Sequence, residues 1–482
     1  MNNKDLQTIV AWAKRRGFVY PGSSIYGGLA NAWDLWPYGT ILRKNIIDLW
    51  WKEFIQKRPD IIPLDAAILM NPKVWEASGH VENFNDPMID DKNTWERFRV
   101  DKLIEAKIEE LRQQLTDEQI LEKINKEFWV TNLIPESWSF DQMKAFIEKY
   151  IPNNPNTWKP ANWTDVRKFN LMFKTHQGVI EDESTVVYLR PETAQWIFVN
   201  FKNILDTMRV KLPFGIAQIW KAFRNEITPG NFLYRVREFE QMEIEYFVQP
   251  YHDEEYFEKW KKWSWDWWTK TIWIKEENLR FRDHEPDELS HYSKWTTDIE
   301  YSFPWWWWEL QGIARRTDYD LRQHMKHSGQ DLQYSDPKTW KRFIPWVIEP
   351  SWGLTRAIFT TMLDAYDEEQ YTDPKWRTQT RVVARFHKNV APIKFAILPL
   401  LEKNEDMVNL AQNIFKELSQ DYMVELDIKG NIWKRYRRQD EIWTPYCITI
   451  DYQTLEDWTV TIRDRDTMQQ QRIKIEEIKK FM

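Results

Sequence analysis

The chain has 482 residues, 29% of them charged and 42% hydrophobic, so two or three domains are expected rather than one core. Its formal net charge of −7 argues against nonspecific nucleic-acid binding, and its single cysteine, Cys447, excludes an internal disulfide framework and is typical of a reducing, cytoplasmic compartment. Apolar runs stay below the roughly 20 residues of a membrane helix and residues 1–5 lack a signal-peptide core, so no membrane association is expected.

The first half of the chain is predicted to be mainly helical. Residues 4–17 have apolar residues at helical spacing and end at Gly17, as at a C-cap. The glycine- and proline-punctuated stretch 18–39 is expected to be irregular. Residues 40–57 have the pattern of an amphipathic helix, which Pro59 and Pro63 close. Residues 95–150 are charged and helix-prone, which indicates a helical insertion.

The second half is predicted to contain strands and then a small α/β domain. Alternating β-branched and aromatic residues predict antiparallel strands at 214–220, 237–248 and 296–303. Residues 367–390 are polar and contain a proline, which predicts a linker. Strand, helix and strand patterns then alternate over 391–428, which favours βαβ units.

The most informative pattern is FRNEI at 223–227 followed by RVREFEQME at 235–243. It resembles motif 2 of the class II aminoacyl-tRNA synthetases. Three further segments in family order, RPETAQ at 190–195, ELQGIARRTDYDL at 309–321 and EPSWGLTRAI at 349–358, narrow the resemblance to glycyl-tRNA synthetase of the homodimeric type. The resemblance runs through nearly the whole chain.

The resemblance implies an α+β fold, with a class II catalytic core whose antiparallel sheet is flanked by helices. The expected domains are an N-terminal part of the catalytic domain with motif 1 at 1–90, a helical insertion at 91–165, the core with motifs 2 and 3 at 166–375, and an α/β anticodon-binding domain at 385–482. In the family, motif 1 forms the dimer interface, so a homodimer is expected. From periodicity alone, residues 40–57 could equally be an ordinary surface helix.

The implied activity is glycine–tRNA ligation: glycine and ATP, with Mg²⁺, give glycyl-adenylate, and glycine then passes to the 3′ end of tRNA(Gly). The resemblance places Arg224 on the α-phosphate, Phe239 and Arg356 on the adenine, and Glu226 and Glu309 on the adenine or the magnesium. The implied catalytic residues are Arg224, Glu226 and Arg356. The implied ATP-binding set is Arg224, Asn225, Glu226, Tyr234, Arg235, Arg237, Phe239, Glu309, Leu310, Gly353 and Arg356.

A glycine pocket must close around the Cα and offer several acceptors to an ammonium group. The glycine-binding set implied by the resemblance is Arg99, Glu192, Phe239, Glu240, Gln241, Met242, Glu243, Glu349 and Ser351. Clustered carboxylates suit a site that awaits a cation, although ion pairs with Arg190 or Arg237 are a competing interpretation. In the basic run 434–438, Arg435, Arg437 and Arg438 are expected to bind tRNA.

Many relatives carry a zinc knuckle of two Cys-x-x-Cys pairs at the insertion. The matching positions here are Asp91 and Thr94, then Asn154 and Thr157. Because no thiolate remains, no structural zinc is expected.

Thirty-one tryptophans against 13 glycines invert the usual ratio. Twelve tryptophans stand where the family has glycine: Trp36, Trp95, Trp129, Trp158, Trp196, Trp220, Trp273, Trp306, Trp308, Trp433, Trp443 and Trp458. Ordinary drift would scatter substitutions over many residue types, and an indole defeats both uses of glycine, positive φ and close backbone approach. We hypothesise that these codons are UGA, read as glycine in the source organism and written here as tryptophan.

Other tryptophans stand where the family tolerates aromatics, and these are expected to be genuine: Trp50, Trp51, Trp75, Trp138, Trp163 and Trp307. Trp295 and Trp352 are not assigned. If Trp196 and Trp352 are literal, their indoles are expected to crowd the glycine pocket and impair activity.

Two rival functions remain. One is a non-catalytic nucleic-acid-binding relative of the same fold, which is expected to lose the ATP arginines and the acidic pocket. The other is a class II synthetase for a different amino acid, against which the RPETAQ and EPS segments speak.

Overall fold

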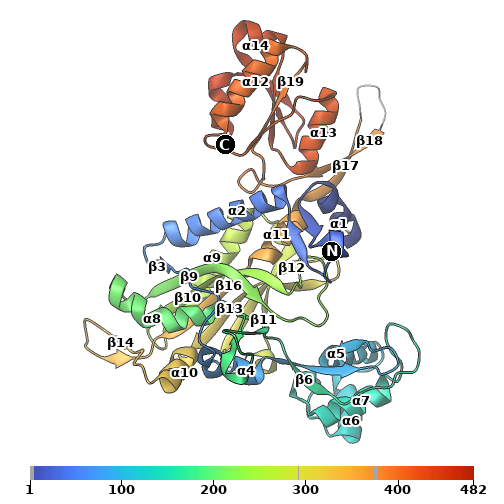
Figure 1. Ribbon diagram of the computed structural model, residues 1–482, viewed down its shortest axis with the longest axis vertical. Coiled ribbons are helices and arrows are strands. Elements are labelled where there is room, and N and C mark those ends of the chain that lie inside the picture. Colours follow the sequence, from blue (N-terminus) through green and yellow to red (C-terminus); the bar gives the residue numbers. More distant parts are fainter. Residues whose placement is uncertain (1–4, 291, 373–377) are drawn as a thin grey trace.

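The computed structural model describes residues 5–290, 292–372 and 378–482 (Figure 1). Its central feature is a seven-stranded sheet in the order β11-β12-β13-β16-β10-β9-β3. The strands are β3 (Ile61–Pro63), β9 (Phe214–Phe223), β10 (Glu238–Val248), β11 (Leu279–Asp283), β12 (Trp295–Ser302), β13 (Trp307–Thr317) and β16 (Trp346–Gly353). All neighbours are antiparallel except β3, which runs parallel to β9. The three predicted strands are therefore confirmed.

The two faces of this sheet have different roles because side chains alternate along a strand. On β10, Met242, Ile244 and Tyr246 lie in the main apolar core. That core is covered by α2 (Pro37–Trp51), α9 (Asp253–Asp266) and α11 (Leu354–Ala365). On the opposite face, Phe247 packs under α8 (Ala194–Met208), and α10 (Tyr319–Ser328) lies beside α8. This second face carries Glu243 and Glu245 of β10.

The predicted N-terminal helices are present. Helix α1 (Leu6–Arg15) is capped by Asp5, whose side chain accepts a hydrogen bond from the Thr8 amide. Helix α2 begins at Pro37 and continues into a π-helical turn, η2 (Lys52–Gln56). The segment expected to be irregular contains a short antiparallel ladder of β1 (Val19–Pro21) and β2 (Trp33–Leu35). Short helices α3 (Lys73–Ala77) and α4 (His80–Asn83) lead towards the insertion.

The helices predicted over residues 95–150 are present, and they pack around a core of their own. Its helices are α5 (Val100–Arg112), α6 (Asp117–Phe128) and α7 (Phe140–Tyr150), and its sheet has the order β5-β4-β6, with β4 (Asn85–Asp90), β5 (Arg97–Arg99) and β6 (Arg167–Asn170). Besides β1–β2, the catalytic half has two more small antiparallel ladders. Strand β7 (Lys174–His176) pairs with β8 (Val186–Tyr188), and β14 (Tyr334–Ser335) pairs with β15 (Arg342–Phe343).

Hydrogen bonds join the turn at Asp91–Trp95 to the turn at Asn154–Trp158. The Asn154 Nδ2 group donates to Asp91 Oδ2 at 2.9 Å and to Thr94 Oγ1 at 3.1 Å. Asp91 Oδ1 accepts from the Asn93 and Asn162 amides, and Asn154 Oδ1 accepts from the Thr157 amide. Asp91 and Asn154 are both fully buried. These side chains therefore join the two ends of the insertion directly.

Replacing Asp91 with alanine is expected to destabilise the insertion by about 2–3 kcal/mol, because buried amides and the Asn154 amide lose their acceptor. Denaturant unfolding followed by circular dichroism measures this change. Asp165→Ala is the matched control, since Asp165 pairs with Lys144 at an exposed position. Equal stability of the two variants would contradict the proposed role of Asp91.

The C-terminal domain has a five-stranded sheet in the order β20-β19-β21-β22-β23 (Figure 1, red). Its strands are β19 (Phe395–Pro399), β20 (Val424–Leu426), β21 (Tyr446–Ile450), β22 (Thr459–Asp464) and β23 (Gln470–Lys474), and its helices are α12 (Glu405–Leu418), α13 (Ile432–Ile442) and α14 (Tyr452–Asp457). Strand β19 is parallel to β20 and β21, which confirms the predicted βαβ units.

The linker prediction for 367–390 is wrong in its first part. Residues Tyr366–Thr372 form β17 and Thr378–Ala384 form β18, and the two pair antiparallel. The polar composition hid an alternation that puts Arg381 and Val383 in the interior, with Ala384 buried beside them. Residues 373–377 of the predicted linker lie outside the described residues. The hairpin contacts α13, so it connects the catalytic half to the C-terminal domain.

Tryptophan is unusually frequent at left-handed backbone positions. Of the fifteen non-glycine residues with positive φ in the described ranges, seven are tryptophans: Trp95, Trp129, Trp158, Trp273, Trp340, Trp443 and Trp458. Four of them follow the last residue of a helix, namely α6, α13, α14 and the π-helical η5 (Trp267–Ile272). The other three end turns in which the tryptophan amide donates to a backbone oxygen four residues earlier, at Asp91, Asn154 or Asp336. Six of the seven are 58–84% exposed, and only Trp443 is buried.

Candidate active site

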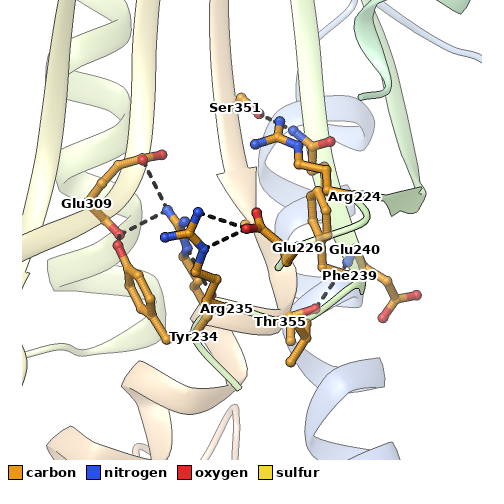
Figure 2. A pocket seen from close by; sticks show the side chains of 13 residues that line it. Arg224, Glu226, Tyr234, Arg235, Phe239, Glu240, Glu309, Ser351 and Thr355 are labelled. Atoms are coloured by element: carbon orange, nitrogen blue, oxygen red, sulfur yellow. Dashed lines mark hydrogen bonds and ion pairs between the residues drawn. The ribbon is translucent and has the colours of Figure 1, made fainter. Parts of the chain in front are cut away.

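A pocket opens on the acidic face of the sheet, and most of the expected ATP-binding residues line it (Figure 2). Its walls come from the loop between β9 and β10, from β10, β13 and β16, and from the start of α11. The lining residues are Arg224, Glu226, Tyr234, Arg235, Val236, Phe239, Glu240, Gln241, Glu309, Ser351, Gly353, Thr355 and Arg356. Segments more than 100 residues apart in sequence therefore meet at one place.

Two ion pairs cross this pocket. Arg235 contacts Glu226 at 2.7 Å, and Glu226 is buried. Arg356 contacts the Glu309 carboxylate at 3.1 Å and donates to the Glu309 backbone oxygen at 3.2 Å. The Arg356 guanidinium also lies over the Tyr234 ring at 4.2 Å, and the Tyr234 hydroxyl donates to the same Glu309 oxygen at 3.0 Å. The arginines are thus held without a ligand.

Arg224 points into the pocket from the end of β9 (Figure 2). Its Nε donates to the Pro191 oxygen at 3.0 Å, and its guanidinium lies 5.2 Å from the Phe239 ring and 5.3 Å from the Phe84 ring. Only one of its nitrogens therefore has a hydrogen-bond acceptor in the described part of the chain. The remaining donors suit an oxyanion, because a guanidinium fork binds two oxygens at once.

The β9–β10 loop is held by the N-terminal segment. Asn31 Nδ2 lies within 2.7–3.2 Å of the backbone oxygens of Gly230, Phe232 and Arg235. Arg237 donates to the backbone oxygens of Glu226 and Ala30, so it braces the loop from outside the pocket lining. The sequence offered no signal for Asn31, because a single asparagine in an irregular segment is unremarkable.

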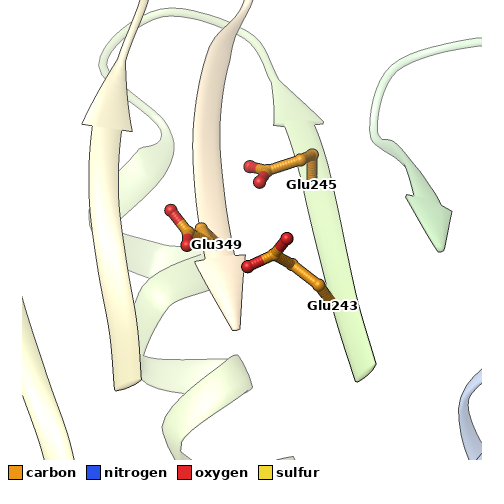
Figure 3. Close-up of side chains that lie close together, drawn as sticks. All are labelled: Glu243, Glu245 and Glu349. Atoms are coloured by element: carbon orange, nitrogen blue, oxygen red, sulfur yellow. The ribbon is translucent and has the colours of Figure 1, made fainter. Parts of the chain in front are cut away.

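Deeper on the same face lies the acidic cluster of Glu243, Glu245 and Glu349, whose carboxylate oxygens come within 4.8 Å of one another (Figure 3). Burial and the charge of Glu192 raise the pKa of Glu243. Burial also raises the pKa of Glu349 to about 8 and that of Glu245 well above its usual value. Both Glu245 oxygens lack a hydrogen-bond partner among the described residues. The cluster therefore favours a positively charged ligand.

One arginine that the sequence analysis missed organises this cluster. Arg316 on β13 is fully buried, donates to Glu349 at 2.5 Å and forms two hydrogen bonds of 2.8–2.9 Å with Asp320. Gln195 connects Asp320 to Glu192, with its Nε2 at 2.9 Å and 3.0 Å from the two carboxylates. A single arginine in a strand is usually a surface charge, so Arg316 was not predicted to be buried. The acidic residue four positions later, Asp320, could have indicated an ion pair.

Several expected glycine-binding residues lie elsewhere. Met242 is in the apolar core, because it faces away from Glu243 on β10. Glu240 also lines the pocket, but its carboxylate pairs with Arg43 of α2. Arg99 pairs with Asp86 at 3.2 Å and with Asp101. Gln241 and Ser351 do lie together in the pocket, at 3.3 Å.

Two expected ATP-binding residues make backbone or core contacts. The Asn225 amide donates to the Leu171 oxygen at 2.7 Å, and the side chain of Leu310 is fully buried. Neither residue lines the pocket with its side chain.

Oxygen donors for a divalent cation lie beside the pocket, next to Glu309. An ideal Cβ on Gly312 would lie 3.7 Å from Asp298 Oδ1 and 4.0 Å from Glu309 Oε1, so glycine leaves room between the two carboxylates. The His284 Nε2 atom lies 2.8 Å from Asp298 Oδ2, and burial raises the pKa of Asp298 to about 6. Glu309 was expected from its motif, whereas Asp298 lies in a strand with no distinctive motif and was not predicted.

The arginines of α13 differ in their surroundings. Arg435 is 1% exposed, and its guanidinium donates to the backbone oxygens of Pro399, Leu400 and Asp427. Arg438 is half exposed and contacts Asp427, and Arg437 donates to the Tyr371 hydroxyl at 2.6 Å. Only Arg437 and Arg438 are placed where a ligand could reach them.

The two tryptophans expected to crowd the glycine pocket take different positions. Trp352 is fully buried in the core on the helix-covered face, where its ring meets Trp50, Phe54 and Trp260, so the expectation is wrong for Trp352. Strand alternation explains this, because the preceding Ser351 faces the pocket. Trp196 packs against Trp75 and lies under the Arg190 guanidinium at 4.6 Å.

No helix within the described ranges is long and apolar enough to cross a membrane. Three family models match the chain: a glycyl-tRNA synthetase insertion domain 1 at residues 86–133, a class II tRNA synthetase core domain (G, H, P, S and T) at 173–364, and an anticodon binding domain at 394–482. These matches follow the three structural units in chain order.

Curated relatives cover the whole length. Proteins named glycine–tRNA ligase from Staphylococcus aureus strains bovine RF122 / ET3-1, JH9 and Newman are each 52% identical to this chain over 479 residues. The alignment spans 99% of this chain and 98% of each relative.

Proposed function

Because the chain belongs to the glycyl-tRNA synthetase family, we propose that it is a glycine–tRNA ligase whose chemistry takes place in the pocket described above. The observation that carries this assignment is the near full-length identity of 52%, together with the class II core. The arginines, the acidic cluster and the neighbouring pocket provide a consistent place for both substrates.

In the first step, the glycine carboxylate attacks the α-phosphorus of ATP and pyrophosphate leaves. Arg224 has free donors at the pocket and neutralises charge on the α-phosphate as it develops. Arg356, held by Tyr234 and Glu309, binds the adenine and γ-phosphate side. Phe239 offers its ring to the adenine. This geometry holds both reactants in one orientation, which is the main contribution that positioning can make.

The acidic cluster supplies the specificity for glycine. Glu192, Glu243 and Glu349 present acceptors to the ammonium group, and Ser351 contributes a hydroxyl. Arg316 balances part of the negative charge through its hydrogen bonds with Glu349 and Asp320. The ammonium group of the substrate supplies the positive charge that these carboxylates still need, which explains why several buried carboxylates lie together.

Magnesium fits the donors on β12 and β13. Asp298 and Glu309 present carboxylate oxygens on either side of Gly312, and oxygen is the ligand that Mg²⁺ prefers. When bound with ATP, the ion supplies charge neutralisation on the phosphates. His284 holds Asp298 in place through their 2.8 Å contact.

In the second step, the 3′ end of tRNA(Gly) accepts the glycyl group, while the C-terminal domain binds the anticodon. Arg437 and Arg438 remain the accessible candidates for that contact. The enzyme acts in the cytoplasm as a homodimer whose motif 1 comprises α2 and β3. Sedimentation velocity distinguishes the dimer from a monomer of 59.0 kDa.

Aminoacylation of purified tRNA(Gly) with labelled glycine tests the assignment. A glycine ligase charges tRNA in an ATP-dependent reaction and does not charge it with alanine or serine. A non-catalytic relative would bind tRNA without charging it, and a synthetase for another amino acid would charge a different tRNA. Either of these results would overturn the proposal.

The natural chain, in this proposal, has glycine at the twelve tryptophans that stand in family glycine positions. Six of those twelve have left-handed φ, where glycine alone is unstrained. Trp340 also has a φ of 60° and closes an Asp336-x-x-Thr339-Trp turn like those at Trp95 and Trp158, so it joins the set. At buried Trp443, the ring centroid lies 3.5 Å from that of Phe386, closer than aromatic pairs usually approach.

Sequencing the coding DNA, with peptide mass spectrometry of the protein from its source, tests this recoding. UGA codons and glycine masses at the thirteen positions are expected, while Trp50, Trp51 and Trp75 are expected to have UGG codons. UGG codons at the left-handed positions would refute the idea.

A further inference from the structure

A buried histidine lies directly behind the proposed ammonium-binding carboxylate. His80, the first residue of α4, is 6% exposed, and its Nε2 atom lies 3.3 Å from Glu192 Oε2. Glu192 is 8% exposed and receives its other contact, at 3.0 Å, from Gln195. The sequence analysis did not single out His80, and it is about 110 residues from Glu192 in the chain.

The surroundings of His80 fix its orientation. The Nδ1 atom lies 2.8 Å from Ser78 Oγ, and the ring packs edge-on against Trp75 at 5.3 Å and tilted against Phe84 at 5.5 Å. The Ser78 hydroxyl also lies 3.3 Å from the Trp75 backbone oxygen, so it contacts both the ring and the preceding turn. The Nε2 atom faces Glu192, where an Nε2–H group can donate to the carboxylate. The backbone also favours this placement, because Gly79 has a φ of 82° and turns the chain into α4.

We propose that His80 is a positioning residue for glycine recognition, which rests on the proposed function. Its Nε2–H group donates to Glu192 and, with Gln195, fixes the carboxylate so that its free lone pairs point towards the substrate ammonium. The charge balance of the site also favours this role. Burial by itself raises the pKa of Glu192, but the charge and hydrogen bond of His80, with the charge of Arg316 and the hydrogen bond from Gln195, hold that pKa well below the usual value.

The role of His80 predicts an effect on glycine rather than on ATP. The hydrogen-bond and ion-pair partners of His80 are Ser78 and Glu192, and neither of them lines the ATP pocket. Loss of a hydrogen bond to a charged group typically changes an equilibrium by about tenfold to a hundredfold. His80→Phe keeps the ring between Trp75 and Phe84 but removes both nitrogens. His80→Gln keeps an N–H donor at a similar reach.

Glycine-dependent ATP–pyrophosphate exchange of the two variants, with glycine at the thirteen tryptophan positions in every chain, tests the proposal. His80→Phe is expected to raise the KM for glycine about tenfold to a hundredfold and to leave the KM for ATP within about twofold. His80→Gln is expected to restore most of the glycine affinity. His176→Phe, at an exposed histidine, is the matched control and is expected to change neither constant.

Three results would overturn this role. They are equal shifts in both KM values, the same glycine KM in the Phe and Gln variants, or a folded His80→Phe variant with unchanged kinetics. Thermal unfolding of each variant identifies a loss of folding as the cause. A parent chain without glycine-dependent exchange overturns the proposed function and this role together, whereas an active parent with any of the three results overturns the role alone.

Discussion

Replacing the six exposed left-handed tryptophans with glycine is expected to raise the free energy of unfolding by about 4 kcal/mol. A left-handed conformation costs a residue with a side chain roughly 1–2 kcal/mol, and the greater entropy that glycine loses on folding offsets about half of this. The residues are Trp95, Trp129, Trp158, Trp273, Trp340 and Trp458. Because their indoles are mostly exposed, little packing is lost. Denaturant unfolding, with the m-value fitted independently, measures the change.

Trp51→Gly is the matched control for this experiment. Trp51 is 42% exposed but has a φ of −58° within helical structure, so glycine there is expected to cost about 1 kcal/mol. The opposite signs separate a backbone effect from a general effect of removing surface indoles. Lower stability of the six-site variant would show that these positions accommodate tryptophan without strain.

Replacing Arg224 with alanine is expected to lower kcat/KM for glycine-dependent ATP–pyrophosphate exchange by about a thousandfold. A preorganised donor to the charge that develops in the transition state is typically worth a hundredfold to a thousandfold. Arg224 additionally orients the α-phosphate, because its planar fork can bind two oxygens. Arg224→Lys keeps the charge but loses the fork, so it is expected to recover only part of the activity.

Arg322→Ala is the control for the arginine variants, since Arg322 is an exposed residue of α10 that pairs with Asp318. Its kinetics are expected to equal those of the parent. Steady-state exchange at saturating glycine and varied ATP gives the comparison. If the Arg224→Ala variant stays within a few-fold of the parent, the phosphate is bound elsewhere in the pocket.

The arrangement of the core could be predicted because its pattern has a physical cause. Alternation with period two placed 214–220, 237–248 and 296–303 on strands, and the same alternation explains why Glu243 faces the site. The prediction treated 239–243 as one contiguous binding segment, so it included Met242, which faces the core, and Glu240, whose carboxylate pairs with Arg43. Motif resemblance specifies a position in sequence, whereas strand geometry specifies a side.

Other features needed the three-dimensional structure. Arg316, Asp298 and His80 are single residues without a local pattern, and their partners are distant in sequence. The β17–β18 hairpin was missed because polar composition outweighed a weak alternation. In contrast, the tryptophan anomaly was visible in composition, and the backbone angles supply a reason that is independent of family resemblance.

Amino-acid-dependent ATP–pyrophosphate exchange by the chain with glycine at the thirteen tryptophan positions, with every standard amino acid tested, examines the account most directly. We expect exchange with glycine alone, and a far lower rate from the chain with tryptophan at those positions. A folded protein that supports no exchange with glycine, or that exchanges equally well with another amino acid, would contradict the account.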